Sequence, residues 1–289
     1  MRTLVSISAT RIARRALLVC RVMKAVPKAL TIAGSDSGAG AGIQADLKTF
    51  AALGVYGTTV ITAITAQNTV AVTKITPLDP DLIAAQFDAV VDDIGANAVK
   101  TGMLATAPII EMVAAKLRRR KLENIVIDPV MIATSGELLL KKNALETLRS
   151  DLIPLAVLVT PNIPEADALT GMHIHTAREI RRAAGRILDM GARSVIIKGG
   201  HRRGPATDLY FDGKKFRELR TRRIRTHHTH GTGCTFSAAI AAYLARGEAL
   251  ESAVVQAKTY ITAAIRHSFP VGAGDGPVHH FYRSWNRKK

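Results

Sequence analysis

The sequence predicts an α/β domain with a mostly parallel central sheet and helices on both faces. Segments rich in Val, Ile and Leu alternate along the chain with segments in which apolar residues recur every three or four positions, as expected of alternating strands and helices. Several of the strand segments are continuous apolar runs, which are typical of parallel strands covered on both faces. The 289 residues show no internal repeat and no second core-sized unit, so we expect one domain over residues 28–289.

The first half of the sheet is expected near the start of this domain. A buried strand over 29–33 leads into a Gly-rich loop, 34–42, and then into a helix over about 43–53. The Thr-rich segment 55–65 is β-branched, and the alternating segment 70–75 is expected to pair with it. Strand, loop and helix in this order make the Gly-rich loop a candidate ligand site.

The later elements continue the alternation. They are a helix begun by Asp79-Pro80, a strand over 98–103, a helix capped by Thr106, strands over 124–130, 155–162 and 194–200, a hairpin over 208–216 with an Asp-Gly turn, a helix after Cys234, and a helix over about 250–265.

The Gly-rich loop 34–42 matches neither of the two common nucleotide-binding patterns. Ile43 stands where the last glycine of G-x-G-x-x-G would be, and no Gly-Lys-Ser/Thr follows as in a Walker loop. The glycines therefore serve another ligand or form a small flap over the active site.

A second glycine loop, His230 to Thr235, opens the helix after Cys234. Unpaired backbone N–H groups at Gly231, Thr232 and Gly233, together with the helix dipole, favour an anion. A thiol at this place would have a lowered pKa, so Cys234 is a candidate base or nucleophile. The alternative is a tight turn followed by a small core cysteine.

Polar side chains follow several strand ends, where ligands bind in parallel sheets. Asn162 and Glu165 offer oxygen ligands that suit Mg²⁺, although the same pair could simply cap a helix. Asp128 is either a metal-proximal acid or a turn former. Lys198 either neutralises a phosphate or is an ordinary strand-end lysine. His227, His228 and His230 fit no zinc spacing.

Composition narrows the function classes. The formal net charge is +17, concentrated between Arg178 and Arg225, which would attract anions. The basic residues are not interleaved with aromatics and accompany no nucleic-acid motif, so we expect a solvated basic face and no nucleic-acid partner. No apolar run is long enough to span a bilayer, and two cysteines make no disulfide framework, so we expect no membrane partner and a cytoplasmic location.

Residues 1–27 stand apart from the domain. They are basic, contain no acidic residue and lack the long apolar core of a secretory signal. We interpret them as a disordered tail or as sequence upstream of a true start at Met23, a targeting peptide being the remaining option.

A set of short motifs is spread over about residues 28–282. They are Gly34-Ser35-Asp36, the run from Gly42 to Thr49, Ala63 to Thr69, Lys100 to Met103, Asp128 to Met131, Thr160-Pro161-Asn162 with Glu165, Lys198 to His201, His230 to Thr235, and Gly276 to Phe281. Together these motifs resemble those of the hydroxymethylpyrimidine/phosphomethylpyrimidine kinases of thiamine biosynthesis, which belong to the ribokinase-like superfamily. The chain has Ser37-Gly38-Ala39 where close relatives often have Pro-Ser-Gly.

The resemblance implies a ribokinase-like fold with a flap over the site, use of ATP and Mg²⁺, and often a homodimer. It implies two reactions, in which 4-amino-5-hydroxymethyl-2-methylpyrimidine becomes a monophosphate and then a diphosphate. The residue roles it implies are pyrimidine contact by Asp46 and Gln67 in a pocket shaped by Gly34 and Met103, a metal and phosphate motif at Asn162 and Glu165, and an anion hole at Gly231 to Gly233. From the residues themselves we expect Asp128 to help hold Mg²⁺, Lys198 to bind phosphate and Cys234 to accept the hydroxyl proton.

Three alternatives remain open from the sequence. A pyridoxine/pyridoxal kinase has the same fold and also uses a flat heteroaromatic substrate with a hydroxymethyl group. A non-catalytic ligand sensor should lack Cys234 or the Asn162 and Glu165 pair, and this chain has them. A nucleic-acid binder would show salt-sensitive affinity.

Overall fold

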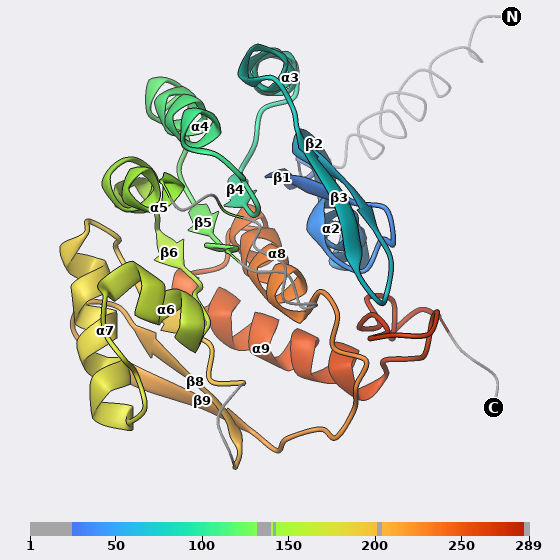
Figure 1. Ribbon diagram of the computed structural model, residues 1–289, viewed down its shortest axis with the longest axis vertical. Helices are drawn as coiled ribbons and strands as arrows, with labels where there is room; N and C mark the ends of the chain where they lie inside the picture. The colour runs from blue at the N-terminus through green and yellow to red at the C-terminus, as the bar shows by residue number, and fades with distance from the viewer. Residues whose placement is uncertain (1–24, 132–139, 141–142, 201–203, 286–289) are drawn as a thin grey trace, which may run out of the picture.

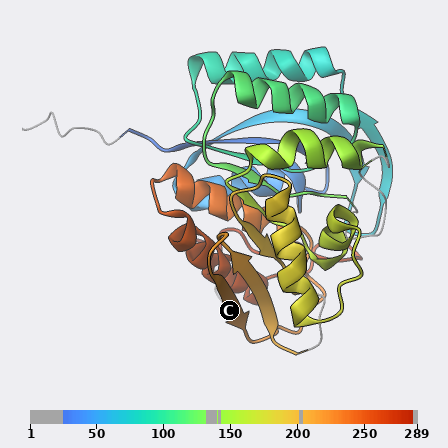
Figure 2. The same cartoon turned by 90° about the vertical axis from the view of Figure 1, so that its left-hand side faces the viewer.

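A computed structural model describes residues 25–131, 140, 143–200 and 204–285 of the chain. Residues 1–24, the greater part of the expected N-terminal extension, lie outside the described residues. Figure 1 shows the sheet running through the molecule with helices on either side of it, and Figure 2 shows the same layers from the side.

Within the described residues, nine strands form one sheet in the order β3-β2-β1-β4-β5-β6-β7-β8-β9. The strands are β1 (Lys28–Asp36), β2 (Tyr56–Gln67), β3 (Val72–Pro77), β4 (Ala98–Thr101), β5 (Ile125–Ile127), β6 (Leu158–Val159), β7 (Val195–Ile197), β8 (Ala206–Phe211) and β9 (Phe216–Thr221). Pairing is parallel from β2 through β1 to β7 and antiparallel at both edges, where β3, β8 and β9 lie. The prediction of a mostly parallel sheet is confirmed.

The helices divide between the two faces of the sheet. They are α2 (Gly42–Ala52), α3 (Pro80–Asp93), α4 (Ala107–Arg119), α5 (Ala144–Thr147), α6 (Ile163–Thr170), α7 (Ala177–Asp189), α8 (Thr232–Ala245) and α9 (Leu250–Arg266). Helices α2, α8 and α9 share one apolar core with the sheet, and α3 to α7 share the other. Among the described helices none is long and apolar enough to cross a bilayer.

The strand pleat explains why both cores are filled by continuous apolar runs. On β5, Val126 points into the core with α8, while its neighbours Ile125 and Ile127 point into the core with α4. On β1, Ala29 and Leu30 divide in the same way. Successive side chains alternate across a strand, so a strand covered on both faces needs apolar residues at every position.

One segment differs from the expectation, and the predicted hairpin is present. The segment 144–155 is helical, as α5, a π-helical turn Leu148–Leu152 and a 3₁₀ turn Ile153–Leu155, and the sequence did not indicate it. The reason is that its pieces are too short to show a helical period, and Pro154 falls within it. The predicted hairpin is present as β8 and β9, with Asp212 to Lys215 between them.

Candidate active site

A pocket of about 660 Å³ lies at the carboxyl ends of the parallel strands. Its lining includes residues that follow or end β1, β2, β4, β5, β6 and β7, together with the loop that opens α8. The predicted site residues that line it are Gly34, Gln67, Met103, Asp128, Asn162, Glu165, Lys198 and Gly231 to Cys234. The fold therefore brings every predicted site residue except Asp46 to one cavity.

Asp46 lies behind the pocket wall. It is fully buried on α2, and its Oδ2 lies 2.8 Å from Lys100 Nζ and accepts a 2.6 Å hydrogen bond from Thr31 Oγ1. Lys100 on β4 is a lining residue, whereas Asp46 is not. Asp46 thus contacts a lining residue without lining the pocket itself, and the pyrimidine contact that the resemblance implies for it stays a prediction.

The glycine loop before α8 touches the Gly-rich loop after β1. Gly231 has φ 76°, and a Cβ on it would lie 1.8 Å from the carbonyl oxygen of Gly40. The N–H of Thr232 donates to Thr229 O at 3.1 Å, so it is already used within the turn. The expectation that Thr232 contributes a free N–H is wrong for this structure, and anion binding by Gly231 and Gly233 stays a prediction.

Cys234 does not have the lowered thiol pKa that its position at a helix start predicts. Burial raises the pKa of Cys234 to about 11, and the negative charges of Asp46 and Asp128 act in the same direction. The positive charge of Lys100 and a hydrogen bond from the Gly42 backbone oppose this rise without overcoming it. The free protein therefore holds Cys234 as a neutral thiol at pH 7.

Asn162 and Glu165 form a capping box at the start of α6. Asn162 Oδ1 accepts from Glu165 N at 2.8 Å, and Glu165 Oε2 accepts from Asn162 N at 2.7 Å. Burial raises the pKa of Glu165 to about 7, with Lys198 lowering it and Asp128 raising it. The cap and the ligand interpretations are compatible, because one carboxylate oxygen is used by the cap and both residues line the pocket.

Asp128 and Lys198 form the charged centre of the pocket. Lys198 Nζ lies 2.9 Å from Asp128 Oδ1 and 3.8 Å from Glu165 Oε2. Asp128 also accepts hydrogen bonds from Thr160 Oγ1 at 3.0 Å and Ser237 Oγ at 3.1 Å. Burial by itself would raise the pKa of Asp128. The positive charges of Lys198 and Lys100 outweigh burial and hold the pKa below its usual value, so this carboxyl is ionised.

The far end of the pocket was not predicted from the sequence. There Asp208 on β8 accepts from Gly199 N at 2.9 Å and from Lys258 Nζ of α9 at 2.7 Å. Arg222, just after β9, lines the same end. With Lys100 and Lys198, these cations make the pocket suitable for a polyphosphate.

Asp36 and His230 also line the pocket and were not among the predicted site residues. Their side chains approach to 2.9 Å, although they lie 194 residues apart in the sequence. A single sequence carries no local signal for such a contact. Among the described residues, no group of three or more His, Cys, Asp or Glu side chains could hold a metal ion, so His227, His228 and His230 form no such site there.

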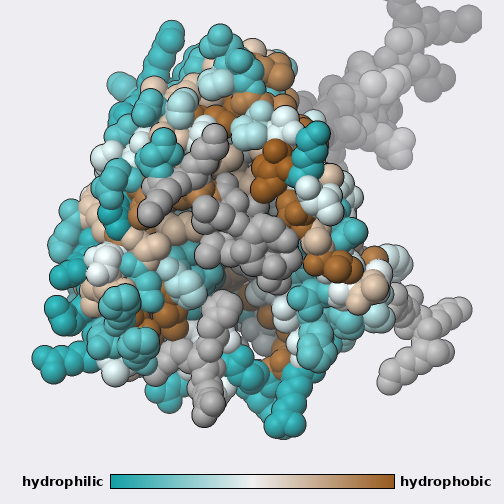
Figure 3. Space-filling view, viewed as in Figure 1, coloured by the Kyte–Doolittle hydropathy of each residue, from teal (hydrophilic) through white to brown (hydrophobic). Residues whose placement is uncertain are grey.

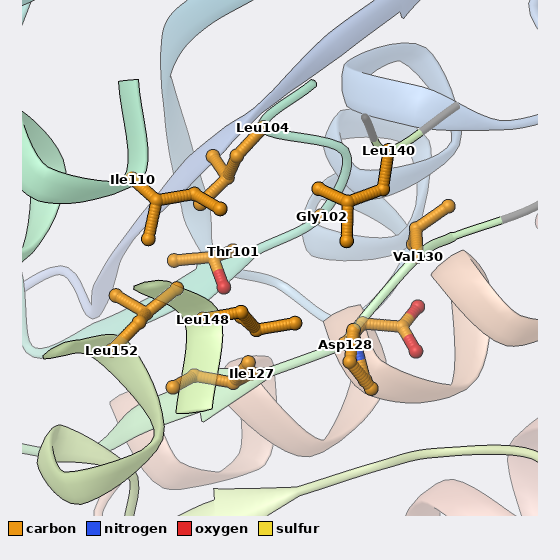
Figure 4. A pocket seen from close by; sticks show the side chains of 11 residues that line it. Thr101, Gly102, Leu104, Ile110, Ile127, Asp128, Val130, Leu140, Leu148 and Leu152 are labelled. Carbon is orange, nitrogen blue, oxygen red and sulfur yellow. The ribbon is translucent and has the colours of Figure 1, made fainter. Parts of the chain in front are cut away.

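A second cavity beside Asp128 is too small for a substrate. Its volume is about 10 Å³, room for about one water molecule. Figure 4 shows mainly aliphatic side chains around it, with Thr101 and Asp128 as the polar exceptions. Thr101, which lines this cavity, has a buried Oγ1 with no hydrogen-bond partner among the described residues.

Comparison with known proteins decides the family. Residues 36–279 match the family model described as phosphomethylpyrimidine kinase. The chain belongs to this family. A hydroxymethylpyrimidine/phosphomethylpyrimidine kinase of Rhizobium meliloti is 52% identical over 261 residues, covering 89% of this chain and 98% of the relative.

Other relatives of this phosphomethylpyrimidine kinase family member are longer. A thiamine biosynthesis bifunctional protein of Geobacter sulfurreducens is 52% identical over 87% of this chain, which spans 51% of that relative's length. Family, kinase class and fold were all expected from the sequence, and each is confirmed.

Solved structures of two named activities resemble this family member. An ADP complex of Bacillus subtilis pyridoxal kinase has TM-score 0.83 and 44% identity, and the match covers 89% of this chain and 98% of that one. A phosphomethylpyrimidine kinase from Clostridium difficile 630 has TM-score 0.74 and 46% identity, covering 82% and 99%. The fold is therefore shared by pyrimidine and pyridoxal kinases.

Proposed function

We propose that this kinase phosphorylates 4-amino-5-hydroxymethyl-2-methylpyrimidine with ATP, first to its monophosphate and then to its diphosphate. Membership of the phosphomethylpyrimidine kinase family supports the reaction class. The observation that carries the proposal is that one pocket joins the pyrimidine-side residues Gly34, Gln67 and Met103 to the glycine loop with Cys234. The acceptor and the transferring phosphoryl group would thus meet in one cavity.

In the first reaction, the hydroxyl oxygen attacks the γ-phosphorus of ATP and the bond to the β,γ-bridging oxygen breaks, releasing ADP. Catalysis of such a transfer is mainly positioning and charge stabilisation. The N–H groups of Gly231 and Gly233 donate to the transferring group, as in an oxyanion hole. Lys198 adds a positive charge beside them, since it lies 3.2 Å from where a Cβ on Gly233 would be.

Cys234 receives the hydroxyl proton in this first reaction. It does so as a thiolate, which the Lys100 charge and the Gly42 N–H stabilise against burial. Because the thiol pKa is about 11, the reactive form is the minor one at pH 7. General-base help of this kind typically contributes about 10²–10⁴ in rate.

The second reaction needs no such base. The acceptor is then a phosphate, whose second pKa of about 6 leaves it ionised at neutral pH. Its oxygen attacks the γ-phosphorus, ADP leaves again, and no proton has to move to Cys234. The positive charges of the buried Lys100 and the partly exposed Lys198 offset the additional negative charge at this step.

The donor set fits Mg²⁺ held partly by substrate phosphates. This ion usually takes one or two protein carboxylates and keeps water and phosphate oxygens as its other ligands. Glu165 and Asp128 are two buried carboxylates on one pocket. Burial raises the pKa of Glu165 to about 7, and a bound cation would favour its ionised form. When bound, the ion would neutralise charge on the ATP phosphates.

Product analysis tests the proposal. Incubation of the protein with ATP, Mg²⁺ and the hydroxymethylpyrimidine should yield the monophosphate and then the diphosphate, resolved by chromatography and mass spectrometry. Omission of Mg²⁺ is the control. Formation of neither product would refute the proposal.

Pyridoxal is the second candidate substrate, because solved pyridoxal kinases share the fold at TM-score 0.83. A competition assay with both compounds at equal concentration separates the candidates. We expect the pyrimidine to have the higher kcat/KM.

A homodimer and a cytoplasmic location stay predictions. Figure 3 shows apolar side chains gathered on the side of the molecule where β2 and β3 lie in Figure 1. Ile64 on β2 and Val70 in the following turn are 45% and 60% exposed. A second copy could cover this edge, and light scattering of the purified protein would measure its mass.

A further inference from the structure

Asp36 and His230 join three segments of the pocket wall. Asp36 ends β1, His230 precedes the anion-binding glycines, and Gln67 ends β2. His230 Nε2 lies 2.9 Å from Asp36 Oδ2 and 3.4 Å from Gln67 Nε2. The pair therefore stands between the pyrimidine side and the phosphate side of the same cavity.

The Asp36 carboxylate is fully used as an acceptor. Its oxygens accept from Gly38 N at 2.8 Å, Gly40 N at 3.1 Å and Ala41 N at 2.8 Å, in addition to His230. Burial raises the pKa of Asp36, but these hydrogen bonds and the histidine outweigh it and lower the pKa overall. An ionised carboxylate only accepts, so the proton of this contact is on His230 Nε2.

This proton decides what Gln67 can do. A protonated Nε2 has no lone pair, so it cannot accept from the Gln67 amide that lies next to it. The amide oxygen of Gln67 faces Thr65 Oγ1 at 3.2 Å, and the same hydroxyl lies 2.9 Å from Ser35 O. The amide hydrogens of Gln67 are thereby left for a ligand in the pocket.

Two hydrogen bonds to Ser37 hold the backbone of Gln67. Ser37 Oγ donates to Gln67 O at 2.7 Å, and Gln67 N donates to Ser37 Oγ at 2.8 Å. The imidazole ring also fills the space beside Gly40, where a Cβ would lie 2.1 Å from His230 Cδ2. The Asp36–His230 contact and the Ser37–Gln67 contacts together link the three segments.

We propose that Asp36 and His230 are a positioning pair that keeps the Gln67 amide hydrogens free to donate to a ring-nitrogen acceptor of the substrate. This inference rests on the proposed function, since it concerns how the same pocket recognises an aminopyrimidine. Removal of the carboxylate lets His230 move its proton to Nδ1, and Nε2 then accepts from Gln67 in competition with the substrate. The pair therefore sets affinity for the heteroaromatic ring rather than for ATP.

Steady-state kinetics of Asp36→Asn and His230→Asn test the pair. We expect KM for both pyrimidine substrates to rise about tenfold, the value of roughly one hydrogen bond, while KM for ATP changes less than about threefold. His227→Asn is the matched control, because His227 is exposed and outside the pocket lining, and it should leave all three constants unchanged.

A Gln67→Ala background separates positioning from simple support of the fold. In that background, Asp36→Asn should raise the pyrimidine KM less than about twofold further, because the group it positions is gone. Equal increases in the KM for ATP and pyrimidine, or a full effect in the Gln67→Ala background, would overturn the inference. Failure of the unmodified protein to phosphorylate the pyrimidine would instead refute the proposed function.

Discussion

Substitution of Cys234 by alanine should slow the first phosphorylation far more than the second. Only the first acceptor carries a proton that must leave, and Cys234 is the group placed to take it. Loss of a general base typically costs about 10²–10⁴ in rate. The second reaction should fall by less than about tenfold, because its acceptor is already ionised.

The pKa of the Cys234 thiol sets how strongly the first reaction of the unmodified protein should depend on pH. With the thiol pKa raised to about 11, only roughly one molecule in 10⁴ holds a thiolate at pH 7. Since kcat/KM reports the free enzyme, its value for the first reaction should rise about tenfold per pH unit from 7 to 9. Glu165 also titrates in the lower part of this range, because burial raises its pKa to about 7, but it serves both reactions.

The ratio of the two rates isolates the thiol from Glu165. Rapid-quench single turnovers, with the hydroxymethyl and phosphomethyl compounds supplied separately, measure each step on the same preparation. The ratio of first to second rate should increase steeply with pH in the unmodified protein and stay flat in Cys234→Ala. A flat ratio in the unmodified protein, or an unchanged slope in the variant, would refute the base role.

Three further results are expected. Gly231→Ala should lower the melting temperature and abolish ATP binding measured by calorimetry, because the added Cβ would collide with Gly40 O. Gly247→Ala is the control, since Gly247 also has a positive φ but has no atom within 4 Å of an added Cβ. It should lower the free energy of unfolding by only roughly 1–2 kcal/mol, the cost of a left-handed backbone for alanine. Burial lowers the pKa of His280 from 6.5 to about 3, so His280 takes up a proton on unfolding below pH 6.5. This uptake should reduce the free energy of unfolding by about 2 kcal/mol at pH 5. In chemical denaturation, His280→Gln should lose less stability between pH 7 and pH 5 than the unmodified protein. The pKa of Asp36 is lowered in the folded state, so below about pH 4 the unfolded chain binds this proton more readily and the protein loses stability. Asp36→Asn should reduce this loss, which melting temperatures measured from pH 5 to pH 2 would detect.

Local patterns predicted much of the fold. Apolar runs marked the central strands, and the Asp79-Pro80 start of α3 has the expected cap, in which Asp79 accepts from Asp81 N. The position of polar residues after strands predicted that Asp128, Asn162 and Lys198 would meet, because parallel strands bring their carboxyl ends to one edge.

What the sequence could not predict depends on distant contacts. The helix start after Gly233 suggested a lowered thiol pKa, but burial and the Asp46 and Asp128 charges, from other elements, reverse the direction. The resemblance assigns Asp46 to the substrate, and the fold adds an ion pair with Lys100, a lining residue 54 positions away in the sequence. Neither result has a signature within a few residues of the group concerned.

The contact between Asp36 and His230 has a consequence for how the protein is made. One partner belongs to the first strand of the sheet and the other is synthesised 194 residues later. At roughly 5–20 residues per second, a ribosome needs about 10–40 s to cover that distance. All nine described strands precede His230 in the sequence, so the ribosome completes every strand of the sheet before the loop after β1 can make this contact. The binding site is therefore the part of the described fold that depends on one of the last segments to be synthesised.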